Sequence, residues 1–237
     1  MLARRLLAEF IGTAFLLIAV VGSGIAAQRL SPGDTGLQLL ENAAATAVAL
    51  VAIILAIGAV SGAHINPVVT LADRAFGGMS TRDAVAYIPM QFAGAVFGTI
   101  IANVMFDVPA VEWSQNQRDG GGILLGEVVA TFGLLLVIFG VVRSGRAALA
   151  PFAVGAYIGG AYFFTSSTSF ANPAVTVARM LSDTFAGIAP GSVPAFIAMQ
   201  LVGAVIALVV VRVLYPDAAA AARDVVVPHP EVKEVST

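Results

Sequence analysis

The chain has 237 residues, of which 59% are hydrophobic and only 11% are charged, and its formal net charge is -2. About a quarter of the residues in an average soluble domain are charged, so this composition indicates a membrane protein, and the slight negative charge argues against a nucleic-acid partner. The chain has no cysteine and two histidines, so we expect no disulfide, no metal site and no cofactor.

Six long apolar segments follow one another along the chain, each long enough to cross a lipid bilayer of about 30 Å. The first resembles the core of a signal peptide, but it is long, carries Glu9 and lacks a convincing cleavage site, so we interpret it as a retained helix. Two further apolar pieces of about ten residues can cross only half of the bilayer. The long segments are about 6–28, 39–60, 83–106, 122–142, 149–166 and 194–215, and the short pieces are about 67–76 and 173–181.

The two halves of the chain repeat each other in three blocks that keep the same order. Each half therefore holds three spans, with one short piece between the second and the third. Because three is odd, the second half enters the membrane from the opposite side, which predicts an inverted repeat of about 1–107 and 122–216 within one domain, 1–216. The matching blocks are 6–9 with 124–127, Asn66-Pro67 with Asn172-Pro173, and 90–91 with 199–200.

The distribution of Lys and Arg predicts the orientation of these spans. With the N-terminus inside, most of these cations fall on the cytoplasmic side, so we expect a multi-pass protein of the inner membrane with both termini cytoplasmic. The tail 217–237 is charged and contains prolines, which predicts a disordered cytoplasmic tail. The inside cations are Arg4, Arg5, Arg74, Arg82, Arg143, Arg146, Arg212, Arg223 and Lys233, and the outside ones are Arg29, Arg118 and Arg179.

Two copies of one polar phrase, 61–70 and 167–176, precede the short apolar pieces. Each ends in Asn-Pro, and proline suits the first position of a helix while asparagine suits its N-cap. Inversion makes the two helix starts face each other near the membrane centre, where each carries about half a positive charge and repels cations. Asn66 and Asn172 can cap these helices only, or can also offer NH2 groups to a permeating molecule. Two copies in register favour the second interpretation.

The doubled Asn-Pro box, together with a glutamate in the first and the fourth span, resembles the aquaporin (major intrinsic protein) family over about 5–215. The resemblance implies an all-α membrane fold of six transmembrane helices and two half-helices, a homotetramer with one pore per subunit, and a channel rather than an enzyme. The boxes that match the family are Asn66, Pro67 and Val68, where the family usually has Asn-Pro-Ala, and Asn172, Pro173 and Ala174.

Three further side chains accompany the boxes. Glu9 and Glu127 are charges inside spans, so they either couple protons or support the loops that lead into the half-helices. Their matching positions and the family resemblance favour loop support. His64 precedes the first box, where we expect it to line the cytoplasmic mouth, and a gating role stays open.

Counting from the boxes gives the family's filter positions as Thr46, Gly160, Ser169 and Val175. The family's pattern has an arginine where this chain has Val175, and arginine supplies a rigid fork of donors and a fixed charge. The resemblance therefore implies a wide filter without arginine, with hydroxyl groups facing an apolar wall. Such a lining suits a neutral solute larger than water, because a charged one would lose too much hydration.

Arg179 lies one helical turn beyond Val175. It can enter the outer vestibule as a substitute charge, or it can extend to the outer membrane interface or pair with Asp183. The second interpretation is favoured from sequence.

The box Ser-Phe-Ala-Asn-Pro-Ala-Val-Thr, followed by Ala-Arg after one residue, is similar to a bacterial subgroup of arsenic-associated aquaglyceroporin-like channels of the AqpS type. This resemblance implies glycerol-like polyols, trivalent arsenite as As(OH)3, methylated arsenicals and water as solutes, although no residue specifies arsenic. The alternatives are a coupled secondary transporter, which also uses inverted repeats, a water-selective aquaporin, a cation or proton leak, and a non-transporting scaffold.

Overall fold

The computed structural model describes residues 2–216, and within that range all regular structure is helical. The predicted tail 217–237 lies outside the described residues. The helices are α1 (Leu2–Leu30), α2 (Thr35–Ser61), α3 (Pro67–Phe76), α4 (Thr81–Met105), α5 (Gly121–Arg143), α6 (Ala150–Phe164), α7 (Pro173–Arg179) and α8 (Val193–Leu214), with single 3-10 turns η1 (Ala147–Leu149) and η2 (Pro190–Ser192) before α6 and α8.

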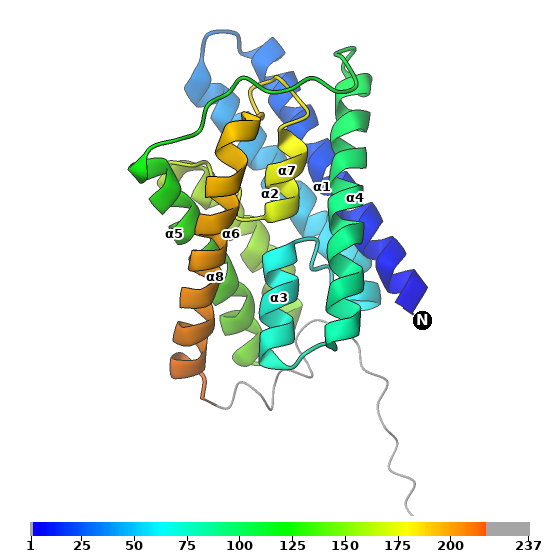
Figure 1. The fold of residues 1–237 in the computed structure, drawn as a ribbon, viewed down its shortest axis with the longest axis vertical. Helices are drawn as coiled ribbons and strands as arrows, with labels where there is room; N and C mark the ends of the chain where they lie inside the picture. The colour runs from blue at the N-terminus through cyan, green and yellow to red at the C-terminus, as the bar shows by residue number, and fades with distance from the viewer. Residues whose placement is uncertain (1, 217–237) are drawn as a thin grey trace, which may run out of the picture.

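Six helical segments are long and apolar enough to cross a membrane, which confirms the spans predicted from the sequence. They are α1, α2, α4, α5, α6 together with η1, and α8 together with η2. The other two, α3 and α7, have 10 and 7 residues, so at 1.5 Å per residue α3 reaches about halfway across the bilayer and α7 about a third of the way. Figure 1 shows α7 in the upper half of the bundle and α3 in the lower half. We call these two ends of the molecule the α7 end and the α3 end.

Glycines allow helices of each half to touch backbone to backbone. A Cβ atom at Gly94 of α4 would lie 2.3 Å from the Phe10 carbonyl oxygen of α1, and one at Gly203 of α8 would lie 2.5 Å from the Val128 oxygen of α5. Small residues are the usual contact between helices in lipid, where close approach replaces the hydrophobic effect. Since Gly94 and Gly203 match in the two halves, the α1–α4 and α5–α8 pairs are built in the same way.

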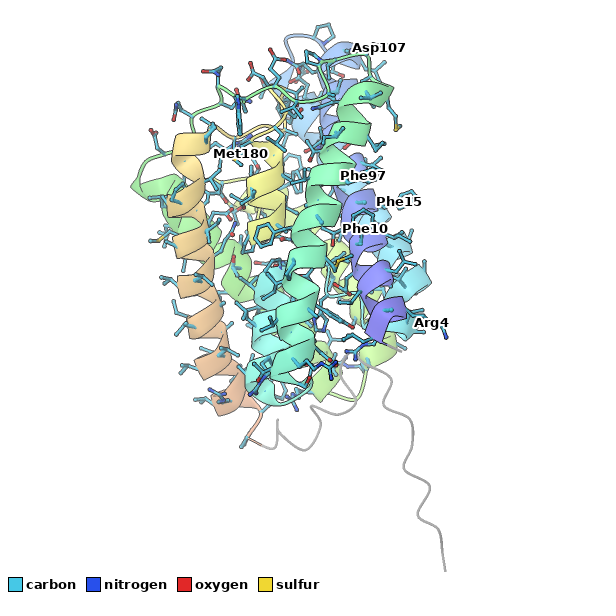
Figure 2. The ribbon with its side chains drawn as sticks, turned by 45° about the vertical axis from the view of Figure 1, so that its right-hand side comes forward. Arg4, Phe10, Phe15, Phe97, Asp107 and Met180 are labelled. Carbon is cyan, nitrogen blue, oxygen red and sulfur yellow. The ribbon has the colours of Figure 1, made fainter. Side chains whose placement is uncertain are left out.

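The half-helices lie in the centre of the molecule, and large apolar side chains cover its outside. Val68 and Ala174, each 0% exposed, belong to the buried core. Phe15 and Phe97, on the neighbouring helices α1 and α4, are 57% and 48% exposed (Figure 2). An apolar exterior of this extent fits contact with lipid.

Candidate functional site

The two boxes cap the two half-helices in the same way. Asn66 precedes Pro67, and its Oδ1 accepts a hydrogen bond of 3.0 Å from the backbone N–H of Val68. Asn172 precedes Pro173, and its Oδ1 accepts one of 3.0 Å from the N–H of Ala174. The side-chain oxygens thus satisfy N–H groups that every helix start leaves unpaired.

The side-chain nitrogens of the same asparagines connect the two halves. Asn66 Nδ2 donates to the carbonyl oxygen of Ala171 at 2.8 Å, and Asn172 Nδ2 donates to that of Ile65 at 2.9 Å. An amide NH2 has two hydrogens, so each asparagine keeps one N–H beyond this reciprocal pair. Capping and solute binding are therefore compatible, because they use different atoms of the same side chain.

The loops that lead into the boxes have a left-handed backbone at residues other than glycine. Ala63 and Ile65 have φ of 49° and 42°, and Ser169 and Ala171 have φ of 54° and 46°. Such conformations are costly for residues with a Cβ and persist only where the surroundings hold them. The equivalent positions agree in both halves, so the repeat extends to the backbone of the loops.

Glu9 of α1 holds the first loop. Its Oε1 accepts hydrogen bonds from the Ser61 hydroxyl at 2.7 Å and from the His64 N–H at 3.0 Å. Its Oε2 accepts from the Ile65 N–H at 2.7 Å and from Gln91 Nε2 at 2.8 Å. The carboxylate is 0% exposed, and its bonds to the loop backbone are the geometry expected of loop support.

Glu127 of α5 repeats this arrangement in the second half. It accepts hydrogen bonds from the N–H groups of Phe170 and Ala171 at 2.9 and 3.0 Å. It also accepts one from Gln200 Nε2 at 2.6 Å. Open backbone in a membrane must find partners within the protein, and these carboxylates are those partners.

Three of the four filter positions predicted by counting are buried. Thr46, Ser169 and Val175 are 2–4% exposed, and the Ser169 hydroxyl has no partner among the described residues. Gly160, in contrast, lies on the exposed face of α6, and Phe164 of the same helix is the only side chain within 4 Å of a Cβ built there. Gly160 therefore stays a filter position predicted by its count from Asn172.

Tyr162 is the residue of α6 that reaches this group. Its hydroxyl lies 3.1 Å from the Thr46 hydroxyl, and it is 3% exposed. Two positions along a helix correspond to a rotation of about 200°, so Tyr162 and Gly160 lie on nearly opposite sides of α6. Counting from Asn172 did not select Tyr162, which the phase of the buried residues of α6 would have indicated. A large side chain thus lies beside Thr46.

Arg179 lies inside the protein, which overturns the expectation that it extends to the membrane interface or pairs with Asp183. It is 2% exposed, its Nε donates to the Ala186 carbonyl, and its guanidinium is 3.5 Å from the centre of the Phe170 ring. Asp183 instead accepts a hydrogen bond of 2.8 Å from the Gln115 N–H. A buried arginine therefore stands one turn beyond Val175.

A hollow of about 650 Å³ opens at the α7 end. The connection between α4 and α5 crosses this end (Figure 1), and its Ser114 N–H donates to the Met180 carbonyl just after α7. Arg118 of the same connection lines the hollow and lies 5.0 Å from the Phe170 ring. The hollow is lined by Gln28, Gln115, Asn116, Gln117, Arg118, Ile123, Asp183, Thr184 and Phe185.

At the α3 end, His64 is 2% exposed between the first box and the start of α4. Its Nδ1 lies 3.0 Å from the Thr70 hydroxyl and its Nε2 lies 3.6 Å from a carboxylate oxygen of Asp73. Among residues 2–216, no group of three His, Cys, Asp or Glu side chains could hold a metal ion.

Comparison with known proteins places this geometry in a family. The sequence profile of the family described as major intrinsic protein matches residues 1–169 and 152–237. Aquaglyceroporin AqpS of Rhizobium meliloti (strain 1021) is 46% identical over 217 residues, 92% of each chain. Probable aquaporin AqpM of Archaeoglobus fulgidus is 30% identical over 87% of this chain and 94% of its own. The solved aquaglyceroporin of Plasmodium falciparum has a TM-score of 0.70 at 21% identity, over 93% of this chain and 100% of that one, which shows a common fold.

The bonds of Glu127 predict a specific loss of stability. Glu127→Gln turns a carboxylate oxygen into an NH2 group that faces N–H donors. Hydrogen bonds to a charged group contribute about 1.5–3 kcal/mol each, so we expect a loss of at least about 2 kcal/mol. The midpoint of thermal unfolding in detergent measures it. Glu112→Gln, an exposed glutamate, is the control, and equal midpoints for the two variants would contradict the role of Glu127.

Proposed function

The chain belongs to the major intrinsic protein family, and from this premise we propose that it is a passive transmembrane channel for small neutral solutes, not an enzyme. The observation that carries the proposal is the pair of capped helix starts that meet at the centre of a membrane-spanning bundle. Asn66 and Asn172 each keep one N–H for an oxygen atom of a passing solute. Water and glycerol-like polyols carry such oxygens.

The charges along the proposed path favour neutral solutes. The two helix starts are each equivalent to about half a positive charge, and Arg179 and Arg118 add positive charge at the α7 end. Cations meet repulsion at both places, and a dehydrated ion of either sign loses more hydration energy than a narrow pore returns. A polyol loses only hydrogen bonds, which the pore can replace.

The proposed filter has a polar side and an apolar side. We propose that the hydroxyl groups of Thr46 and Tyr162 exchange hydrogen bonds with a solute and that Val175 offers an apolar wall. Ser169 remains a filter position predicted from sequence. As(OH)3 is uncharged near neutral pH and resembles a polyol in shape, so we include trivalent arsenite among the solutes. Methylated arsenicals add an apolar group that suits Val175. The relative that is 46% identical is named an aquaglyceroporin, which supports polyol transport here.

The remaining roles follow from the contacts. We propose that Glu9 and Glu127 hold the loops, that His64 lines the mouth at the α3 end, and that Arg179 supplies the charge that Val175 does not. We also propose a homotetramer in the inner membrane, with the α3 end and both termini in the cytoplasm. The excess of Lys and Arg at the α3 end supports this orientation.

Stopped-flow measurements on proteoliposomes test the function. We expect water and glycerol permeabilities well above those of empty liposomes, glycerol flux that rises linearly with its gradient, and no effect of a pH gradient. Arsenite uptake is measured in the same vesicles. Saturable, proton-driven uptake would instead identify a coupled transporter, and water flux without glycerol flux would identify a water-selective aquaporin.

The place of Tyr162 in the filter gives a matched pair of variants. Tyr162→Ala removes a large side chain beside Thr46, so we expect permeability to a solute larger than glycerol, such as erythritol, to rise about tenfold, equivalent to about 1.4 kcal/mol of barrier. Gly160→Ala adds a methyl group on the exposed face of α6 and should leave the permeabilities to glycerol and to erythritol unchanged. The opposite pattern would support the filter obtained by counting.

The buried charge of Arg179 predicts exclusion of cations. Arg179→Met keeps an extended side chain against the Phe170 ring but removes the charge, so we expect proton and potassium leak to rise about tenfold or more. A pH-sensitive dye inside the vesicles measures the proton leak, and retained glycerol flux shows that the channel is folded. If the variant conducts glycerol and its proton leak does not rise, Arg179 is not needed for cation exclusion, which would then come from the helix starts alone.

A further inference from the structure

The hollow at the α7 end is lined mainly by polar side chains, of which the proposed path for solutes uses only Arg118. The volume of the hollow is about 650 Å³, which falls within the range of roughly 300–1,000 Å³ of pockets that bind small molecules. Glycerol would fill only a small part of this volume. The hollow therefore has room for a ligand larger than the solutes proposed for the pore.

The walls of the hollow come from separate segments that hydrogen bonds hold together. Gln28 lies near the end of α1, and its Oε1 accepts a hydrogen bond of 3.2 Å from the Phe185 N–H, after α7. The Gln115 N–H, in the connection between α4 and α5, donates to Asp183 Oδ1 at 2.8 Å. Because the protein itself fixes these walls, a ligand does not have to order them when it binds.

Two residues of opposite charge, Arg118 and Asp183, line this hollow. Among residues 2–216 they do not form an ion pair with each other. Their charges cancel, so the lining is neutral overall, which suits an uncharged ligand. Because the two charged groups stay apart in one hollow, a ligand that both donates and accepts hydrogen bonds can bind to both of them.

Both charged side chains keep hydrogen-bonding capacity for a ligand. Arg118 Nε donates to the Gly187 carbonyl at 2.8 Å, and its Nη2 donates to the Phe185 carbonyl at 3.3 Å. A guanidinium has five N–H donors, so the fork keeps further donors, those on Nη1 among them. Asp183 accepts from the Gln115 N–H through Oδ1, and its Oδ2 accepts no hydrogen bond from the residues that the structure describes.

Four amide side chains and the half-buried ring of Phe185 make up most of the remaining lining. An amide both donates and accepts hydrogen bonds, and an aromatic ring offers an apolar face. Sugars and sugar alcohols match this combination, because their neighbouring hydroxyl groups donate and accept while their C–H groups pack on a ring. The amides belong to Gln28, Gln115, Asn116 and Gln117.

We propose that this hollow is a binding site for a neutral polyhydroxyl molecule of the size of a hexose or a hexitol. Arg118 donates to its hydroxyl oxygens, Asp183 Oδ2 accepts from its hydroxyl groups, and Phe185 packs against its C–H groups. Arg118 also lies 5.0 Å from the ring of Phe170, which belongs to the loop before the second box. A bound ligand therefore stands beside this loop and obstructs the entry of solutes, a consequence that rests on the proposed channel function.

Saturation-transfer NMR with sorbitol, on the purified protein in detergent, tests the site. We expect a transfer signal that saturates with sorbitol concentration. Asp183→Asn keeps the oxygen that accepts from Gln115 but replaces the other oxygen by NH2, so the dissociation constant should rise about tenfold, as expected for one lost hydrogen bond to a charged group. Arg118→Lys keeps the charge but loses the fork of donors and should weaken binding similarly.

Asp119→Asn is the matched control, because Asp119 is an exposed carboxylate of the same connection that does not line the hollow. It should keep the wild-type dissociation constant. An unchanged constant in a folded Asp183→Asn or Arg118→Lys variant overturns the site, and so does an equal loss of binding in Asp119→Asn. A wild type without a saturable signal overturns it without any variant.

Exchange of labelled glycerol in proteoliposomes tests the obstruction, with sorbitol at equal concentration on both sides so that no osmotic gradient arises. Glycerol exchange should fall by about half when sorbitol reaches its dissociation constant, and Asp183→Asn should need more sorbitol for the same fall. Exchange that sorbitol leaves unchanged overturns the obstruction. A wild type that conducts no glycerol without sorbitol overturns the channel function, whereas the binding site is judged by the NMR result.

Discussion

The structure depends on two buried carboxylates that satisfy open backbone inside a membrane. A half-helix cannot begin at the centre of a bilayer unless the loop before it finds hydrogen-bond partners within the protein. Glu9 and Glu127 are those partners, and each also receives an amide of the third span of its half, Gln91 or Gln200. Once both loops are held, the two helix starts face each other, and the asparagines can bond across the halves while they cap their own helices.

The two halves of the chain share the residues and backbone conformations that hold the half-helices, but they differ in other side chains. The glutamates, the asparagines and the left-handed backbone of the loops recur in both halves, because each is needed to bring a half-helix to the membrane centre. Other equivalent positions differ between the halves. The position of Asp73 in the first half corresponds to Arg179 in the second, and that of His64 corresponds to Phe170. The two halves thus share one backbone frame but carry different side chains on it.

Most of the fold and the central boxes of the candidate site could be predicted from sequence. The six spans and the two half-helices follow from hydropathy and length, and the boxes follow from their duplication. The contacts around the filter positions could be predicted less well, because a count along the chain does not show which side chains of other helices meet them. Tyr162 reaches Thr46 across more than 100 residues of sequence. Arg179 was misplaced for a related reason: a long side chain can turn inward or outward, and its partner, the Ala186 carbonyl, lies beyond the helix that carries it.

The sequence by itself determined that the chain is a membrane protein with inverted halves and two polar helix starts, because composition, segment length and repetition are properties of the chain alone. Only the tertiary structure decided which side chains meet around those starts. The reciprocal bonds of Asn66 and Asn172, the contact of Tyr162 with Thr46, and the bonds of Glu9 and Glu127 to the loops each join residues from different segments. Their geometry depends on helix rotation and side-chain direction, which packing sets and which no pattern along the sequence records.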